Sequence, residues 1–451
     1  MYSQNRGLFP MRNNVTEICG FLILSKMKKI VLSISLIPLL LTGNAVLARV
    51  ATGGQPGAFL SWGAGARSLG MGKAFVSIAD DASATYWNPA GASKVERQEA
   101  VGLYTQLFAG TMYNFLSYVY PTVESGTFGA SFTSLYLGGF EVVNEDNIKT
   151  DEFSDSRAVL GLSYGREMLE GFDLGVSLKY LYHKIYTYSK GNAIMDLGIL
   201  WTPPWWRLKH LRLGINLQNL VNVIILGETE DKLPRVIRGG LSYRLLQDRL
   251  VIGVDTDKAL AGGTTTYFNW HAGVEYWVMK YAALRLGIDT QETTVGFGVK
   301  FKDYEIDYAF ALQELGYSNR VSLTARFGRP IEVQREELAD KYYREGIKAY
   351  HAGLYILAQE KLAHALDLHP GRMEIRDLLV RLDTVIKTLH LEERKQRKSE
   401  DYYKQALKYY KQHNWLRARE MVEEAIKLNP LSQPARELKE KINNIIKITT
   451  K

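Results

Sequence analysis

The sequence predicts an all-β, 14-stranded transmembrane barrel with an N-terminal lumen plug, followed by a small all-α helical domain. Three observations support this fold class. Residues 98–330 alternate apolar and polar side chains, as strands do when one face meets lipid and the other a polar interior. Most of the predicted strands span about ten residues, the length that a tilted membrane strand needs. Beyond residue 330, only 3 of the 39 glycines remain and the pattern becomes helical.

Residues 1–48 are expected to hold an upstream extension and a secretory signal peptide. Met-Lys-Lys at 27–29 precedes an apolar run at 30–41 and a small-residue end, the order typical of a signal peptide. That run is too short to span a bilayer. The mature chain is therefore expected to begin at Arg49. In an alternative reading, residues 21–24 belong to the signal peptide and lengthen its apolar region, rather than to the upstream extension.

Residues 49–97 are predicted to form the plug. Glycine and alanine dominate residues 63–91, and these small residues let a backbone lie close to a barrel wall. Asn88 and Pro89 predict a turn before the first strand, because proline fixes its own φ and restricts the residue before it. An ordinary glycine-rich loop is the alternative. The plug residues with an expected structural or gating role are Gly70, Gly72, Asp80, Asp81, Trp87, Asn88, Pro89 and Gly91.

Two roles are open for Asp80 and Asp81. In a plug, their carboxylates would bond to wall residues such as Arg212 or Lys179. Alternatively, they cap a short helix over residues 82–86.

The run Ala-Asp-Asp-Ala-Ser-Ala at 79–84, followed by Asn-Pro-Ala-Gly at 88–91, resembles the plug segment of PorV/PorQ-like proteins. That family lies within the FadL-like group of outer-membrane β-barrels. The resemblance covers about thirty residues and implies a 14-stranded barrel in a bacterial outer membrane.

The predicted strands begin near residues 99, 112, 126, 157, 172, 193, 210, 235, 249, 267, 281, 292, 304 and 318. Connections after even-numbered strands are expected to be short. The two long connections, 138–156 and 220–234, follow odd-numbered strands. Short periplasmic turns and long external loops give this parity, so both ends of the barrel region 98–330 and the domain after it are expected in the periplasm.

Residues 331–451 are predicted to form a helical domain that contains a duplication. Residues 341–370 align without gaps on 401–430, and each unit resembles a tetratricopeptide repeat (TPR). The residues that fill the aromatic, small, alanine and proline places of the motif are Tyr342, Gly346, Ala358, Ala365 and Pro370, then Tyr402, Ala406, Ala418, Ala425 and Pro430. Residues 371–398 are expected to supply a linking helix, and 434–447 a terminal one.

Composition argues against several classes of function. The net charge of +8 comes from the first 48 and last 121 residues, so no basic face predicts nucleic-acid binding. The single cysteine, Cys19, precedes the expected cleavage point, and the histidines form no metal-binding spacing. His183 and His271 are expected to face the lumen, but a lipase or deacylase would need one beside a serine such as Ser177. We therefore expect no enzyme activity, cofactor or metal.

Two functional classes follow from the resemblance. PorV and PorQ serve type IX secretion, holding cargo or accessory factors at the outer membrane, whereas FadL takes up apolar molecules through a gated lumen. The repeats favour the first class, since a peptide-binding groove implies a periplasmic or secreted protein partner. Besides outer-membrane lipid, the second class would add a hydrophobic ligand in the lumen.

Overall fold

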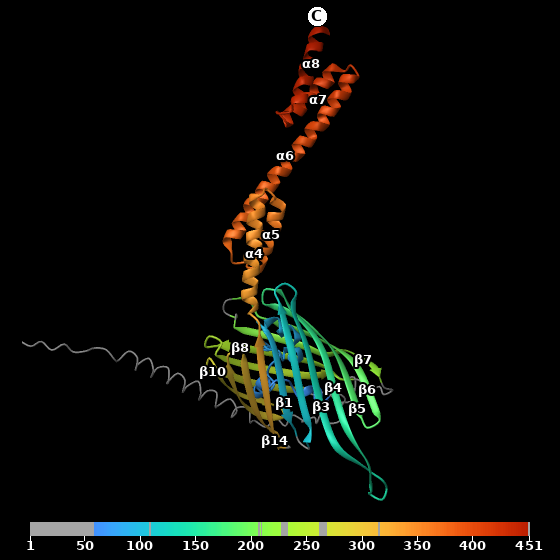
Figure 1. Cartoon of the computed structure of the whole chain (residues 1–451), viewed down its shortest axis with the longest axis vertical. Helices are drawn as coiled ribbons and strands as arrows, with labels where there is room; N and C mark the ends of the chain where they lie inside the picture. The colour runs from blue at the N-terminus through green and yellow to red at the C-terminus, as the bar shows by residue number, and fades with distance from the viewer. Residues whose placement is uncertain are drawn as a thin grey trace, which may run out of the picture.

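The computed structural model describes residues 58–107, 110–205, 208, 210–226, 233–260, 268–313 and 316–449. The predicted signal peptide, the expected start at Arg49 and the first residues of the predicted plug lie outside them. Fourteen antiparallel strands close into a barrel in which β1 pairs with β14 (Figure 1). The strands are β1 (Gln98–Gln106), β2 (Met112–Thr122), β3 (Gly126–Val143), β4 (Lys149–Leu169), β5 (Phe172–Ile185), β6 (Tyr188–Trp201), β7 (Leu211–Leu226), β8 (Arg235–Leu245), β9 (Leu250–Leu260), β10 (Phe268–Met279), β11 (Ala282–Asp289), β12 (Glu292–Phe301), β13 (Tyr304–Gln313) and β14 (Gly316–Phe327).

The barrel confirms the predicted strand number and order. Twelve of the fourteen starts lie within two residues of the prediction, and β4 and β6 begin earlier than expected. Gln98 pairs with Phe327, so the chain enters and leaves the barrel at the same end. That end carries the connections after the even-numbered strands.

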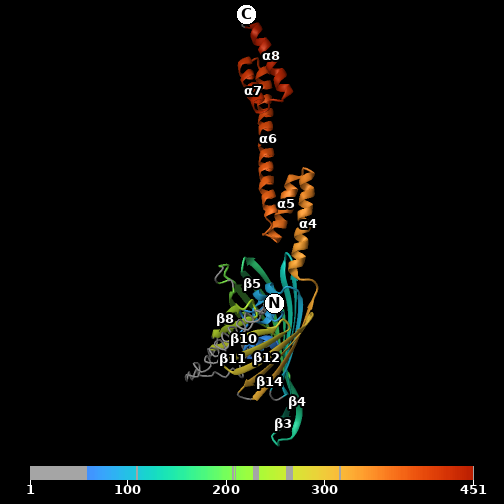
Figure 2. The same ribbon diagram turned by 90° about the vertical axis from the view of Figure 1, so that its left-hand side faces the viewer.

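Three predicted connections differ from the structure, and one of them, 220–234, is shortened because β7 continues to Leu226. The expected long loop at 138–156 is mostly β structure, because β3 and β4 continue as a two-stranded ribbon beyond the barrel, on the side opposite the helices (Figure 2). The connection from β6 to β7, residues 202–210, is longer than the short turn that was predicted. Pro203 and Pro204 lie there and lack the N–H groups that would extend the ladder.

The wall separates an apolar exterior from a polar interior. In β11, the outward side chains of Leu284 and Leu286 are 57% and 58% exposed, whereas Arg285 between them points inward and is 1% exposed. Similar alternation recurs in the other strands, and buried acids, arginines and serines line the lumen. This distribution is that of a membrane barrel with a polar lumen.

None of the helices in the described part of the chain has the length and apolar character needed to cross a bilayer.

The plug fills the lumen with short helices joined by turns. They are η1 (Ala58–Ser61), α2 (Ala66–Gly70), α3 (Ala84–Trp87) and η2 (Pro89–Lys94), drawn in blue inside the barrel in Figure 1. Nearly every residue from 63 to 92 is buried. The hydrophobic core lies where this segment meets the inner wall.

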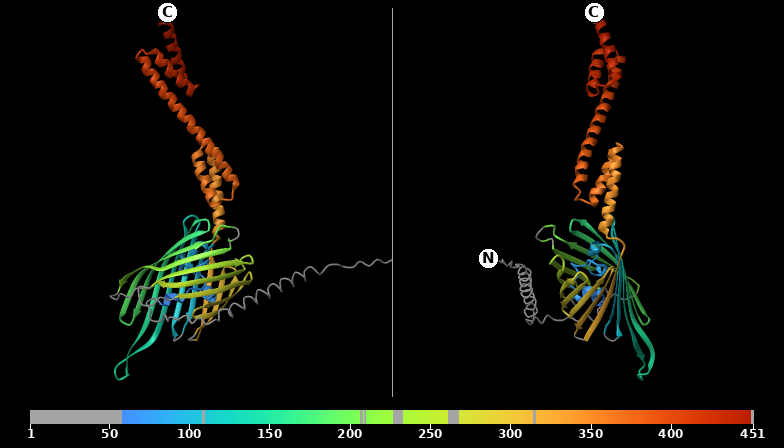
Figure 3. Two further views of the ribbon diagram at one scale, coloured as in Figure 1. Left: turned by 180° about the vertical axis from the view of Figure 1, so that it is seen from behind. Right: turned by 60° about the vertical axis from the view of Figure 1, so that its left-hand side comes forward.

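The chain leaves the barrel into five helices that rise from one rim (Figure 3). They are α4 (Ile331–His351), α5 (Tyr355–Leu368), α6 (Met373–Lys411), α7 (Trp415–Leu428) and α8 (Gln433–Thr449). The Ile331 N–H donates to the Glu96 carbonyl at 2.7 Å, which joins the start of α4 to the plug's last residues. α4 packs on α5, the C-terminal half of α6 packs on α7, and α8 follows α7.

The predicted linking helix is not a separate element. It continues into the first helix of the second repeat, so α6 runs unbroken for 39 residues. Residues 387–398 contain no glycine or proline and are rich in lysine, arginine, glutamate and leucine, which favour a helix. The predicted terminal helix is confirmed as α8.

Candidate functional site

The plug is fitted to the wall by small residues on both sides. Gly72 has a φ of 62°, and a Cβ there would lie 2.5 Å from the backbone nitrogen of Ile288 in β11. Gly70 lies against Gly296 in β12, where an added Cβ would be 3.4 Å from that residue's Cα. Within the plug, a Cβ at Gly91 would be 2.0 Å from the Ala79 carbonyl oxygen. Gly72 and Gly91 are therefore required by close backbone approach, whereas an added Cβ at Gly70 would make ordinary van der Waals contact.

The wall supplies its own glycines opposite the plug, a feature that the sequence analysis missed. A Cβ at Gly273 in β10 would lie 2.2 Å from the Met71 carbonyl, and one at Gly175 in β5 would lie 2.2 Å from Ala90. Gly214 in β7 similarly faces Val76. Inward-facing glycines in the period-two pattern are the sequence signal that points to these contacts.

Trp87, Asn88 and Pro89 form the centre of the plug. The buried Trp87 indole donates from Nε1 to the Ala64 carbonyl at 2.7 Å. The Asn88 amide donates to the carbonyls of Val76 in the plug and Ile199 in β6, each at 3.0 Å. Pro89 begins η2, where its missing N–H costs nothing. The predicted turn thus joins two parts of the plug to the wall.

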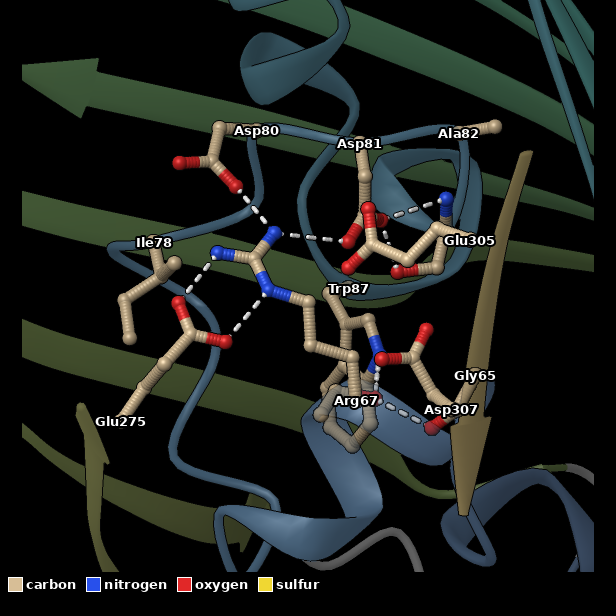
Figure 4. A network of polar contacts seen from close by, with 12 residues as sticks. Gly65, Arg67, Ile78, Asp80, Asp81, Ala82, Trp87, Glu275, Glu305 and Asp307 are labelled. Atoms are coloured by element: carbon tan, nitrogen blue, oxygen red, sulfur yellow. Dashed lines mark hydrogen bonds and ion pairs between the residues drawn. The ribbon is translucent and has the colours of Figure 1, made fainter. Parts of the chain in front are cut away.

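Arg67 is the central residue of the plug's ionic contacts (Figure 4). Its guanidinium lies 2.7 Å from Asp80 and 3.0 Å from Asp81, and it binds both oxygens of Glu275 in β10 at 2.8 and 2.9 Å. The Arg67 side chain is 16% exposed and that of Glu275 is 1% exposed. In this low-dielectric setting, each charge depends on the others for compensation.

The two aspartates differ in their remaining contacts. Asp80 also pairs with Arg244 in β8, so it bridges plug and wall. Asp81 accepts from the Ser83 backbone N–H at 2.9 Å and from the Ser83 hydroxyl, and Ser83 is the N-cap of α3. Asp80 thus bonds to the wall, as one alternative proposed, whereas Asp81 does not cap α3, because its side chain bonds to the N-cap residue and α3 has no side-chain cap hydrogen bond.

The predicted wall partners of these carboxylates were wrong. Arg212 donates to the Ile78 carbonyl at 3.1 Å, and Lys179 pairs with Asp196 in β6. Arg67 was missed, although Arg67 and Lys73 are the two cations that precede the Asp80–Asp81 pair within the small-residue run. The register of β8 against the plug, which sequence does not specify, selects Arg244.

Opposing effects act on the Asp80 carboxyl. Burial by itself would raise its pKa, but the positive charges of Arg67, Arg244 and Arg212 outweigh burial and hold the pKa well below its usual value. Asp80 is therefore a carboxylate over the whole physiological pH range.

The ionic contacts continue around the wall to the strand pair that closes the barrel. Arg285 binds Glu275 and Asp307, each at 2.7 Å. In the closing pair, Glu99 of β1 is the register partner of Arg326 of β14, and Arg326 donates to Glu99 at 2.7 Å. The other Glu99 oxygen accepts from the Ala82 N–H of the plug at 2.8 Å. The plug thus contacts the seam where the barrel closes.

A second ionic cluster holds the other side of the plug. Lys73 lies 2.9 Å from Asp289 in β11 and 3.3 Å from Glu292 in β12. Glu292 also binds Arg320 of β14. His271 lies 3.1 Å from Asp257 in β9. These contacts join five strands, β9 to β12 and β14, to the plug through buried polar and charged side chains.

His183 and Ser177, the residues considered for a barrel lipase, bond to other groups. His183 lies 2.8 Å from Asp155, but the Ser177 hydroxyl bonds to Ser163 at 2.6 Å. Within the described ranges, no group of histidines, cysteines and acids has the geometry of a metal site.

In the helical region, the predicted packing residues lie at helix contacts. Gly346, Ala358 and Ala365 are buried between α4 and α5, as are Ala406, Ala418 and Ala425 between α6 and α7, and Tyr342 and Tyr402 pack at the edges. A Cβ at Gly346 would lie 2.7 Å from the Leu362 side chain. Pro370 and Pro430 follow α5 and α7 by two residues. The helical pairs are thus as predicted, and the assignment to the TPR family stays a prediction.

One family model matches the chain. The model of "Type IX secretion system protein PorV" matches residues 45–192, a third of the chain that includes the plug and the strands from β1 into β6. A comparison with curated proteins gives no match.

Solved structures with some likeness include hydrocarbon channels. A deltaS2 mutant of the monoaromatic hydrocarbon channel TodX matches with a TM-score of 0.45 and 15% identity, over 59% of this chain and 99% of that one. TodX, the Pseudomonas putida toluene transporter, gives 0.42 and 15%, over 58% and 96%. A Pseudomonas aeruginosa FadL homologue gives 0.39 and 12%, over 57% and 96%. The fold of the present chain is defined by its own strand pairing.

Proposed function

We propose that this protein is an outer-membrane barrel of PorV type that acts in protein secretion or surface assembly, with its helical region docking a protein partner in the periplasm. The observation that carries the proposal is the match of residues 45–192 to the PorV family model, which spans the plug and the strands that hold it. Closed barrels with an apolar exterior cross membranes without exposed strand edges, which supports the membrane location.

The charged lining of the lumen favours a role as a membrane anchor over a role as a channel for apolar solutes. Charged side chains, including Arg285, Glu275, Asp307 and Arg320, line the inner wall, and the plug occupies the space between them. An apolar ligand would have to displace compensated charges, at a cost of several kcal/mol for each ion left unpaired. FadL-like uptake of a hydrophobic ligand remains the alternative, and it requires the plug to move.

The helical region supports a docking role. Two helical pairs project beyond the rim: α4–α5 lies next to the barrel, and the long helix α6 carries its own pair with α7 further out (Figure 2). Helical repeats contact only their neighbours and present extended surfaces that bind other molecules.

The test is deletion of the gene in its own organism, followed by quantitative proteomics of the cell surface and medium. The proposal predicts loss of a set of secreted proteins, restored by the full chain but not by a version that ends at residue 330. Unchanged secretion together with impaired growth on apolar compounds would instead establish uptake.

A further inference from the structure

The two helical repeats share an exposed basic surface that packing does not require. Arg344, Lys348 and His351 follow one another along α4, and at an offset of 60 residues Lys404, Lys408 and Lys411 do so along α6. All six side chains are exposed. The spacing of four and three residues places each triplet on one face of its helix. We call these two triplets the twin basic ridges.

In the part of the chain that the structure describes, the lysines of the ridges are not neutralised by neighbouring carboxylates. Within the described residues, none of Lys348, Lys404, Lys408 and Lys411 has a carboxylate within ion-pair distance. By contrast, Arg419 and Lys439 both pair with Glu423, at 3.3 and 3.1 Å. The ridge cations are therefore available to a partner.

The second helices of the repeats provide an internal comparison. Two exposed positions there change their charge, since Leu357 corresponds to Arg417 and Asp367 to Lys427, whereas Glu360 and Glu420 match. All three ridge positions hold a basic residue or histidine in both copies. Exposed charges contribute little to stability in either helix, so folding does not require the ridges to be basic.

The partner's chemistry follows from charge complementarity. On α6, Arg394 and Arg397 extend the second ridge on the same face, and Asp401 is an acid within it. We infer that the twin basic ridges dock an acidic segment of a protein partner, one ridge in each repeat. This inference rests on the proposed docking role and names the chemistry of the docked partner.

The position of the ridges favours a polypeptide over a lipid surface. In Figures 1 and 2, α4 and α6 run away from the barrel rim, so the ridges lie outside the belt of apolar side chains that faces lipid. α6 alone spans about 58 Å at the usual helical rise. Two sites on one rod also raise the apparent affinity for a chain long enough to reach both.

The test uses the full-length protein in detergent micelles with fluorescent poly-L-glutamate as the probe, titrated from about 0.05 to about 0.3 M NaCl. The variant Lys404→Glu/Lys408→Glu/Lys411→Glu removes one ridge. The matched control Lys395→Glu/Lys441→Glu/Lys447→Glu makes the same charge change at exposed helical positions off the ridges. The neutral variant Lys404→Gln/Lys408→Gln/Lys411→Gln removes the charge without reversing it, which separates an effect of charge from misfolding. Circular dichroism measures the helicity of each variant.

Ridge reversal is expected to weaken poly-L-glutamate binding by about tenfold at low salt, as three exposed charge pairs allow, whereas the control binds like wild type. The neutral variant should fall between them. Equal loss in ridge and control variants, or no binding by wild type, would overturn the inference. Equal competition by vesicles of anionic phospholipid would also overturn it, in favour of a membrane contact.

A second readout separates this inference from the proposed function. Cross-linking in native envelopes is compared for the wild type and the ridge variant. If both capture the same protein equally, docking stands and the ridges are not its site. If neither cross-links to any envelope protein, the docking role itself fails, whatever the poly-L-glutamate result.

Discussion

Arg67 shows how much of the plug depends on one side chain. It compensates Asp80, Asp81 and Glu275 together, and its own side chain is largely buried. Replacing it with methionine would keep most of the volume but remove the cation that these three carboxylates share, leaving Arg244 beside Asp80 and Arg285 beside Glu275. The contact between the plug and the wall then becomes less favourable.

We expect Arg67→Met to destabilise the folded protein by about 3–5 kcal/mol, the usual cost of breaking a buried ion pair from one side. Urea titration of the refolded protein, followed by tryptophan fluorescence, measures this change. The control is Arg329→Met, because Arg329 pairs with Glu337 on the surface and its side chain is 65% exposed. That control should lose no more than about 1 kcal/mol. Equal effects in both variants would contradict a central role for Arg67.

The depressed pKa of Asp80 gives a pH dependence with a defined sign. A carboxyl whose folded pKa lies below its unfolded value of 3.8 contributes full stability above that value and loses it as the pH falls towards the folded pKa. The stability difference between wild type and Asp80→Asn should therefore be constant from about pH 5 to 8 and shrink below about pH 4. Urea unfolding across this range measures it. A difference that changes near neutrality would show that another group is responsible.

At the scale of elements, the β3–β4 ribbon is separable from the barrel. β3 pairs with β2 only as far as Tyr136, and β4 pairs with β5 only from Asp155 onward, so residues between them pair with each other alone. Phe140 and Phe153 stack at the base of the ribbon with ring centroids 4.9 Å apart. The ribbon therefore contributes little to the closed wall.

Replacing residues 142–151 with a two-residue Asn-Gly turn, which joins the register partners Glu141 and Glu152, should leave barrel stability unchanged within about 0.5 kcal/mol. The retained heat-dependent shift of the folded barrel on electrophoresis, together with urea unfolding, measures this. Loss of folding would mean that the ribbon takes part in closure.

At the scale of the whole molecule, the paired ends of β1 and β14 fix where the helices emerge. The proposed topology places that rim in the periplasm. A protease added to intact cells should then cut at most the ribbon and spare α4–α8, whereas permeabilised cells should lose the helical region. Mass spectrometry of the fragments distinguishes the two. Release of fragments from residues 331–449 by intact cells would contradict this orientation.

The sequence predicted the wall and the repeats because their signals are local and repeated. Alternation of period two marks each strand wherever it lies, and the 60-residue offset marks both helical pairs. It misjudged 138–156 because a projecting polar ribbon has no buried face to produce the pattern. The linking helix at 371–398 was predicted to end before the second repeat. In the structure it continues, because the packing of a helical pair does not require its first helix to begin there.

What the sequence determined by itself is the strand number, the small residues of the plug and the composition of a polar lumen, since each depends on the residue's own chemistry and spacing. Only the tertiary structure decided that Arg67 and Arg244 rather than Arg212 or Lys179 meet Asp80, and that Glu99 joins the plug to the closing strand. Barrel closure and strand register bring together charges more than 160 residues apart. Pairing at such separations is selected by the geometry of the closed wall, which a linear pattern does not contain.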